Sequence, residues 1–149
     1  MMITIREPKT EEEFSAYYEL RWRILREPWN QPRESEKDDK ENIAYHIIAY
    51  ENEPFQVLGV GRIHMKNETE AQIRYMGVEK WYEKQGIGSK ILKKLEKYAK
   101  KKGAQKIFLN SRENAVGFYE KFRYHTVEKA HTLFGEITHY RMEKTISSD

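Results

Sequence analysis

Cysteine is absent from the 149-residue sequence, which excludes disulfides, thiolate metal sites and a cysteine nucleophile. No apolar run approaches the roughly 18 residues that a membrane-spanning helix needs. The N-terminal stretch 1–14 has neither the basic start nor the apolar core of a secretory signal. The sequence also lacks internal repeats and linker-like tracts. We therefore expect one cytoplasmic domain over residues 1–149 that does not associate with membranes.

The sequence also lacks a strong excess of either charge, because 27 Lys and Arg stand against 24 Asp and Glu, for a net charge of +3. Such a balance does not indicate nucleic-acid binding by itself. Lysines crowd the segment 90–102, but no aromatic residue alternates with them as a base-stacking platform would require. A solvated helix face explains these lysines better, so no nucleic-acid partner is expected.

What the sequence does have is hydrophobic periodicity that changes along the chain. Alternation and β-branched runs predict strands over 2–6, 43–50, 55–65, 71–78, 104–109, 124–128 and 137–146. Spacings of three and four predict helices from Thr10 to before Pro28, over 86–102 and over 113–122. Three successive strands before the second helix predict an antiparallel meander. The order indicates one α+β domain with a mixed sheet.

A glycine-rich turn opens the second predicted helix, directly after the strand that ends at Val78. Its residues are Lys84, Gln85, Gly86, Ile87, Gly88 and Ser89. Such a turn directs unpaired backbone N–H groups and the positive helix end at one point, which suits a pyrophosphate. A turn that only starts a helix explains the glycines equally well, and neither a Walker A loop nor a dinucleotide fingerprint fits them.

Two motifs resemble the GNAT superfamily of N-acyltransferases. Residues 78–88 are similar to its acyl-CoA-binding motif, Q/R-x-x-G-x-G/A, and AVGFYEKF from Ala115 to Phe122 is similar to its second motif. Looser similarities over 20–27, at His46 and at 135–139 resemble the ElaA-like subgroup. The resemblance implies a single domain over 1–149 whose predominantly antiparallel central sheet is splayed between the fourth and fifth strands and flanked by helices.

The resemblance also implies roles for individual residues. Acetyl-CoA would be the co-substrate, with no metal, and an amine acceptor would be attacked directly in a ternary complex. Besides the turn residues 84–89, the implied contacts to acetyl-CoA are Met76, Gly77, Val78, Arg112, Phe118 and Tyr119. Tyr119 would protonate the departing thiolate. Periodicity alone would make Tyr119 a core residue, and the family match reverses that preference.

Three departures from the family pattern bear on the site. Glu83 stands where the family has Gln or Arg, and Arg112 stands where it has Asn or Gln. Arg123 replaces a glycine, and it would cost about 1 kcal/mol if the turn there needs a positive φ.

The general base and the acceptor stay open at this point. His139 and His46 match histidines of the ElaA-like pattern, but a water chain beside Glu70 or Tyr75 serves equally. The acidic segment 34–41 suits a cationic acceptor such as a polyamine, although a disordered solvated loop is the preferred interpretation.

The sequence therefore predicts an acetyl-CoA-dependent N-acetyltransferase that acts on a small-molecule or peptide amine, as a monomer or homodimer. A non-catalytic acyl-CoA-binding or regulatory module is the alternative, and a nucleic-acid-binding domain is the least favoured interpretation.

Overall fold

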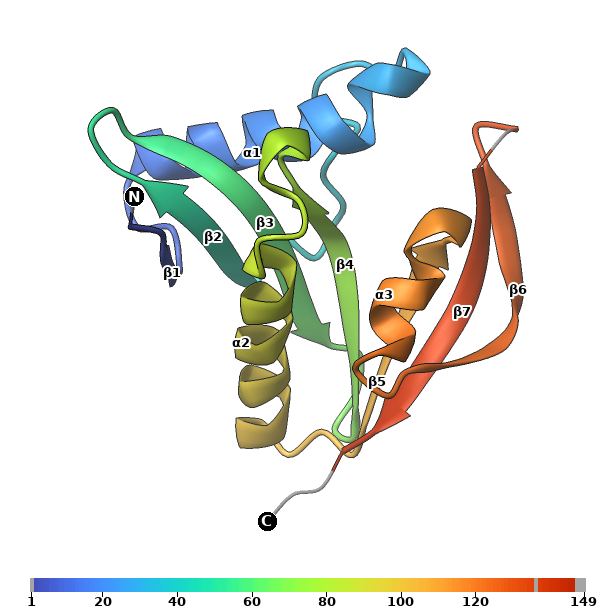
Figure 1. Ribbon diagram of the computed structural model, residues 1–149. Coiled ribbons are helices and arrows are strands. Elements are labelled where there is room, and N and C mark those ends of the chain that lie inside the picture. The colour runs from blue at the N-terminus through green and yellow to red at the C-terminus, as the bar shows by residue number, and fades with distance from the viewer. Residues whose placement is uncertain (1, 136, 147–149) are drawn as a thin grey trace.

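The computed structural model describes residues 2–135 and 137–146, which form a seven-stranded sheet with helices on both faces (Figure 1). The strands are β1 (Thr4–Arg6), β2 (Tyr45–Glu51), β3 (Gln56–Met65), β4 (Glu70–Val78), β5 (Lys106–Arg112), β6 (His125–Leu133) and β7 (Ile137–Thr145). The helices are α1 (Glu11–Leu25), α2 (Ile87–Lys101) and α3 (Val116–Glu120), with short 3-10 turns η1 (Glu27–Trp29), η2 (Lys80–Tyr82) and η3 (Glu113–Ala115). The strand order is β1-β2-β3-β4-β5-β7-β6, and β4–β5 is the parallel pair. The predicted mixed, mostly antiparallel α+β fold is confirmed.

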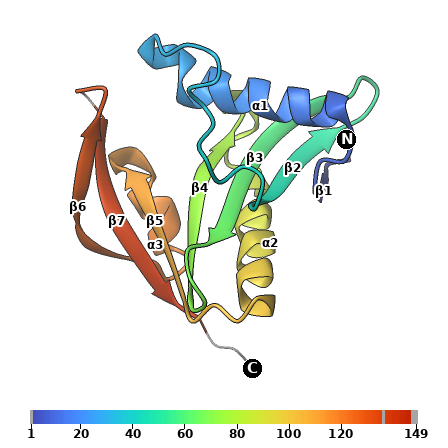
Figure 2. The ribbon, with the colours of Figure 1, turned by 180° about the vertical axis from the view of Figure 1, so that it is seen from behind.

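Helices α1 and α2 cover opposite faces of this sheet, as the two views in Figures 1 and 2 show. A Cβ added to Gly61 of β3 would lie 2.6 Å from Ile91 of α2, whereas one added to Gly77 of β4 would collide with Ile24 of α1. The side of α2 that faces the sheet is the predicted apolar stripe, which is buried, while its lysines at 90, 93, 94 and 97 are exposed. The predicted apolar stripe and the lysine-bearing exposed face of this helix are therefore both present.

The sheet is splayed between β4 and β5. Their parallel pairing runs from Glu70 with Lys106 to Ile73 with Leu109 and then stops. Strand β4 continues to Val78 without this partner, and β5 turns to β7, with which it pairs as far as Arg112 opposite His139. The divergence that the family resemblance implied is thus present, and it opens a gap between two strands of one sheet.

An irregularity in β4 decides which side chains reach each side of this gap. The register between β3 and β4 shifts between Val60 and Arg62, and Tyr75 has a φ of 60°. Arg74 and Tyr75 consequently both lie on the α1 side, where the Arg74 guanidinium is 4.6 Å from the centre of the Tyr75 ring. Met76 lies on the α2 side, packed among the residues of the larger core. The bulge therefore separates two chemically different walls.

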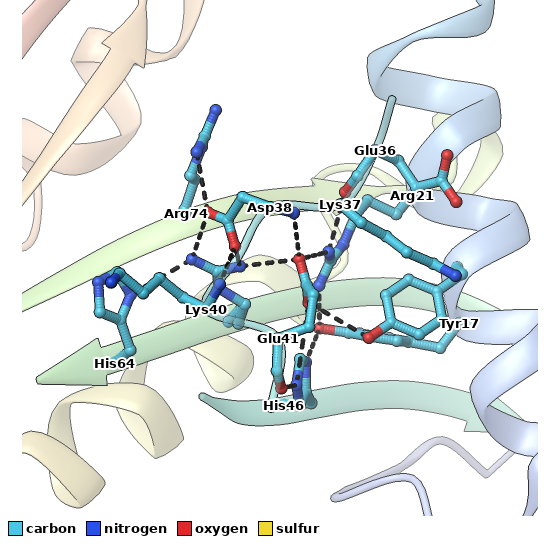
Figure 3. A network of polar contacts seen from close by, with 12 residues as sticks. Tyr17, Arg21, Glu36, Lys37, Asp38, Lys40, Glu41, His46, His64 and Arg74 are labelled. Carbon is cyan, nitrogen blue, oxygen red and sulfur yellow. Dashed lines mark hydrogen bonds and ion pairs between the residues drawn. The ribbon is translucent and has the colours of Figure 1, made fainter. Parts of the chain in front are cut away.

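The acidic segment between η1 and β2 is ordered and packed, so the expectation of a disordered, solvated loop is wrong. Figure 3 shows Asp38 and Glu41 among arginines from the sheet and from α1. Asp38 pairs with Arg62 at 2.5 Å and with Arg74 at 2.9 Å, and Glu41 pairs with Arg21 at 2.9 Å. Hydrophobic periodicity did not reveal this because arginines of α1 and of the sheet, rather than apolar residues, hold the segment.

Strand β6 is longer and the third helix shorter than predicted. The sequence indicated a strand over 124–128, but pairing with β7 continues to Leu133 although most β6 side chains are exposed. Alternation cannot detect an edge strand that buries neither face. The predicted helix over 113–122 divides into η3 and the five-residue α3.

Arg123 occupies a left-handed turn after α3, with a φ of 72°. The Arg123→Gly variant should therefore be more stable to unfolding by about 0.5–1 kcal/mol, since relief of strain outweighs the added entropy of the unfolded chain. Urea denaturation of the two proteins measures this difference. Arg123→Ala keeps a side chain at the same φ, and an equal gain in that variant would contradict the explanation.

Candidate active site

A cavity of about 310 Å³ lies where β4 and β5 diverge. Its walls come from the end of α1, the diverging halves of β4 and β5, the η3–α3 segment, and the paired strands β6 and β7. The lining residues are Leu25, Arg26, Gln72, Ile73, Arg74, Tyr75, Met76, Leu109, Asn110, Ser111, Arg112, Ala115, Tyr119, His131, Leu133 and His139. Of the predicted site residues, Met76, Arg112, Tyr119 and His139 meet here.

The glycine-rich turn lies at the start of α2, on the face of the sheet opposite α1. Gly86 is the N-cap of α2 with a φ of 83°, and no side chain caps this helix end. The first backbone N–H groups of a helix have no partners within the helix. A Cβ on Gly86 would meet nothing within 4 Å, so the turn is open to an approaching group.

The remaining predicted coenzyme contacts lie around this turn. A Cβ on Gly88 would be 3.3 Å from the Phe118 ring and 3.7 Å from Val78, so the start of α2 packs closely against α3 and the end of β4. Gly77 lies next to Val78, where it contacts α1. Lys84, Gln85 and Glu83 are exposed beside the turn, and Lys84 has a φ of 66°. An uncapped helix end with open backbone and an adjacent lysine fits a pyrophosphate.

Tyr119 of α3 lines the cavity on the α2 side. Its side chain is buried, and the hydroxyl donates to Sδ of Met76 at 3.6 Å. Burial raises the pKa of Tyr119 above that of an ordinary tyrosine, so the phenol stays protonated at neutral pH. The side chain is also part of the core, with its ring edge-on to Phe118 at 5.1 Å. Tyr119 therefore lines the cavity and is also part of the core.

His139 of β7 lines the same cavity. Its Nδ1 lies 3.0 Å from the carbonyl oxygen of Ile137, and this contact places the ring proton on Nδ1 and leaves Nε2 as an acceptor. The ring stacks on His131 of β6, with centroids 4.5 Å apart. Burial lowers the pKa of His139, and the charges of His131, Arg112 and Arg26 lower it further, against the opposing effect of the Ile137 carbonyl. The His139 ring is therefore neutral at physiological pH.

The structure does not bring His46 to this cavity. Its Nδ1 lies 2.7 Å from the hydroxyl of Tyr17, and its Nε2 lies 2.9 Å from the carbonyl oxygen of Glu41. Both ring nitrogens are thus occupied in the polar network of Figure 3, which connects α1 to the acidic segment. His46 therefore does not line this cavity, and both of its ring nitrogens are hydrogen-bonded within the protein.

Glu70 and Tyr75, which were considered beside a proton-accepting water chain, lie toward opposite ends of β4. Glu70 lies at the paired end, 3.6 Å from Nζ of Lys106, and does not line the cavity. Tyr75 does line it, but burial raises its pKa, and its ring lies against the guanidinium of Arg21 at 4.2 Å.

Arg112 lines the cavity but lies away from the glycine-rich turn. Its Nη2 donates to the carbonyl oxygen of Leu25 at 3.1 Å, so the side chain crosses from β5 to the end of α1. Two further residues line the cavity without having been predicted from the sequence, Arg26 and His131. Arg26 follows α1 directly and lies within the loosely similar stretch 20–27, where nothing singled it out, and His131 lies in the part of β6 that showed no strand signal.

Among residues 2–135 and 137–146, no group of three or more His, Asp or Glu side chains is arranged to hold a metal ion. No helix in the same part of the chain combines the length and hydrophobicity needed to cross a lipid bilayer. Glu136, which belongs to the ElaA-like similarity over 135–139, lies outside the described residues.

Comparison with known proteins agrees with this architecture. Residues 14–124 match the family model described as the acetyltransferase (GNAT) family. The chain is 33% identical over 136 residues to a Bacillus subtilis protein named uncharacterized N-acetyltransferase YjcF, covering 91% of this chain and 95% of the relative.

Solved structures share the fold at low sequence identity. Escherichia coli ElaA superposes with a TM-score of 0.80 at 18% identity, covering 96% of this chain and 99% of that one. An aminoglycoside 6'-N-acetyltransferase complexed with coenzyme A superposes with a TM-score of 0.76 at 17% identity, covering 97% of each chain. With the splayed sheet and the open turn at α2, the family match over residues 14–124 establishes that this chain belongs to the acetyltransferase (GNAT) family.

Proposed function

We propose that this protein transfers an acetyl group from acetyl-CoA directly to an amine within the splayed cleft. The observation that carries the proposal is the cavity itself, since it joins a buried protonated phenol, Tyr119, to a histidine with a free acceptor nitrogen, His139. Family membership supports acetyl transfer to nitrogen in general. These two groups supply the proton donor and acceptor that the reaction needs.

The co-substrate is held by the α2 side of the cleft. Backbone N–H groups from Gly86 to Ser89 bind the pyrophosphate, with Lys84 beside them. The backbone of Met76 and Val78 binds the pantetheine arm, because the splay leaves their outward edge free of β5. Acetyl-CoA supplies the acetyl group as an activated thioester.

Proton movements are assigned to opposite sides of the cleft. His139 Nε2 accepts the proton of the attacking amine as the carbon–nitrogen bond forms, and Tyr119 donates its phenolic proton to the sulfur as the carbon–sulfur bond breaks. Alignment of the reactants between the two walls contributes the remaining acceleration.

Activity should depend on pH through His139. Since the neutral imidazole is the base and burial lowers its pKa, kcat/KM should stay high below the ordinary histidine pKa of about 6.5 and fall at more acidic pH. The His139→Asn variant should lose this acid limb along with most of its turnover. An unchanged pH profile in the variant would mean that another group, or water, accepts the proton.

The proposal as a whole is tested by coenzyme A release and by detection of the acetylated amine, with the protein, acetyl-CoA and a panel of amines. Intersecting initial-velocity patterns are expected, because both substrates must be bound before transfer. Acetyl-CoA binding without amine-dependent thiol release across the panel would instead support the non-catalytic acyl-CoA-binding module.

A further inference from the structure

Two arginines meet at one carbonyl oxygen on the α1 wall of the cleft. Nη1 of Arg26 lies 3.0 Å and Nη2 of Arg112 lies 3.1 Å from the carbonyl oxygen of Leu25, and each donates a hydrogen bond to it. Arg26 is 8% exposed and Arg112 is half-buried. Arg26 also donates from Nε to the carbonyl oxygen of Ser35 at 3.0 Å. Two like charges are therefore held side by side by neutral carbonyl acceptors.

No carboxylate of the described residues forms an ion pair with either arginine. Every other buried or half-buried arginine in this part of the chain has one, as Arg62 has in Asp38 and Arg141 has in Glu143. Burial and the charge of Arg26 lower the pKa of Arg112, which indicates that the pair repel each other. A buried cation without a counter-charge costs free energy, and a bound anion would remove that cost.

The surrounding cavity is also suited to an anion. None of its described lining residues is Asp or Glu. The nearby carboxylates of the acidic segment are already engaged, since Asp38 and Glu41 pair with Arg62, Arg74 and Arg21. This arrangement removes the basis for expecting a cationic acceptor such as a polyamine.

The position of the pair separates it from the coenzyme phosphates. Arg26 and Arg112 lie on the α1 face, whereas the uncapped start of α2 lies on the other face of the sheet (Figures 1 and 2). Arg112 is also the cross-strand partner of His139, the proposed base. Side chains of directly opposed residues on antiparallel strands lie within about 5.5 Å at Cβ.

We propose that the acceptor is a small amine that also carries an anionic oxygen group, a carboxylate or a phosphate, which Arg26 and Arg112 bind. This inference rests on the proposed function and specifies its acceptor. Guanidinium groups bind planar oxyanions through paired hydrogen bonds, so the anion fixes the orientation of the molecule. Its amine, a few bonds away, then lies beside Nε2 of His139.

The test compares acceptors that differ in this charge alone. Glycine and glycinamide, β-alanine and β-alaninamide, and phosphoethanolamine and ethanolamine are assayed at saturating acetyl-CoA, with spermidine as the cationic amine. The anionic member of at least one pair should have a kcat/KM at least about ten-fold higher than its neutral partner. The pair that shows this difference distinguishes carboxylate from phosphate. Equal or greater activity with the neutral amines or spermidine would overturn the inference while leaving acetyl transfer intact.

Variants of Arg26 and Arg112 test whether these two residues cause the preference for anionic acceptors. Arg112→Gln should abolish the difference between charged and neutral acceptors, and Arg112→Lys should retain part of it. Arg141→Gln is the matched control, because that arginine lies on the neighbouring strand and already has Glu143 as its partner. Thermal melting checks that each variant is folded. If Arg112→Gln is unfolded, Arg26→Gln is expected to give the same loss of the difference between charged and neutral acceptors.

If Arg112→Gln weakens desulfo-CoA binding as much as it weakens acceptor use, the anion belongs to coenzyme A and the inference fails.

Calorimetry separates failure of this inference from failure of the proposed function. N-acetylglycine carries the carboxylate without a reactive amine, and N-acetylglycinamide is its neutral match. Binding of N-acetylglycine at least about ten-fold tighter than the amide, lost in Arg112→Gln, would support the anion site even if no amine were acetylated. Equal affinities, or no binding of either compound, together with no charge preference in turnover would overturn it.

Discussion

Replacing Gly86 with valine is expected to weaken acetyl-CoA binding by about 100-fold or more. The N-cap of α2 has a φ of 83°, and its backbone is open. A valine would have to leave that conformation or place its methyl groups where the pyrophosphate approaches, so several backbone hydrogen bonds to the phosphates would be lost together. Calorimetric titration with desulfo-CoA measures the effect without turnover.

The other end of the same helix provides the control. Gly103 follows α2 with a φ of 88°, and a Cβ there would also meet nothing within 4 Å. Gly103→Val should therefore have a similar cost in stability, about 1–2 kcal/mol, with no change in coenzyme affinity. Equal affinities in the two variants would show that coenzyme A does not bind at the start of α2.

Removing the phenolic hydroxyl of Tyr119 should lower kcat by about 100-fold or more, while the dissociation constant for acetyl-CoA stays within about two-fold. Tyr119→Phe keeps the ring and its packing and removes the hydroxyl, which contacts Sδ of Met76. The lost group is the one that protonates the leaving sulfur. Steady-state kinetics together with calorimetry separates kcat from binding.

Tyr124→Phe is the matched control for this variant. The Tyr124 ring is buried and lies edge-on to Tyr119 at 5.7 Å, but its hydroxyl donates to Glu96 at 2.8 Å and does not line the cavity. Its removal should lower stability and leave kcat nearly unchanged. A normal kcat in Tyr119→Phe would rule out Tyr119 as the proton donor and make it a core residue only.

Local patterns predicted the elements on which the coenzyme side of the site depends. Apolar spacing located α2, the glycines marked its start, and the strand before them ended at Val78 as expected. These features depend on residues close together in the sequence. The family resemblance then supplied the splay, which local patterns cannot reveal, because it depends on where pairing between β4 and β5 stops.

The acceptor side of the site could not be predicted from local sequence patterns. His46 and His139 both matched the subgroup pattern. Only long-range contacts show that His46 is hydrogen-bonded to Tyr17, whereas His139 faces the cavity. The acidic segment looked solvated because its partners, Arg62 and Arg74, lie more than twenty residues away. Arg26 and Arg112 are brought together only by the end of α1 meeting the end of β5.

A single-turnover experiment shows whether the acetyl group passes directly from acetyl-CoA to the amine. The protein is mixed in excess with acetyl-CoA labelled in its acetyl group, an acceptor amine is added, and both the protein and the amine are analysed by mass spectrometry over time. If transfer is direct, the label passes to the amine at the rate of coenzyme A release and the protein stays unlabelled throughout. Label on the protein, or label that stays in bound acetyl-CoA for every amine tested, would contradict direct transfer in this cleft.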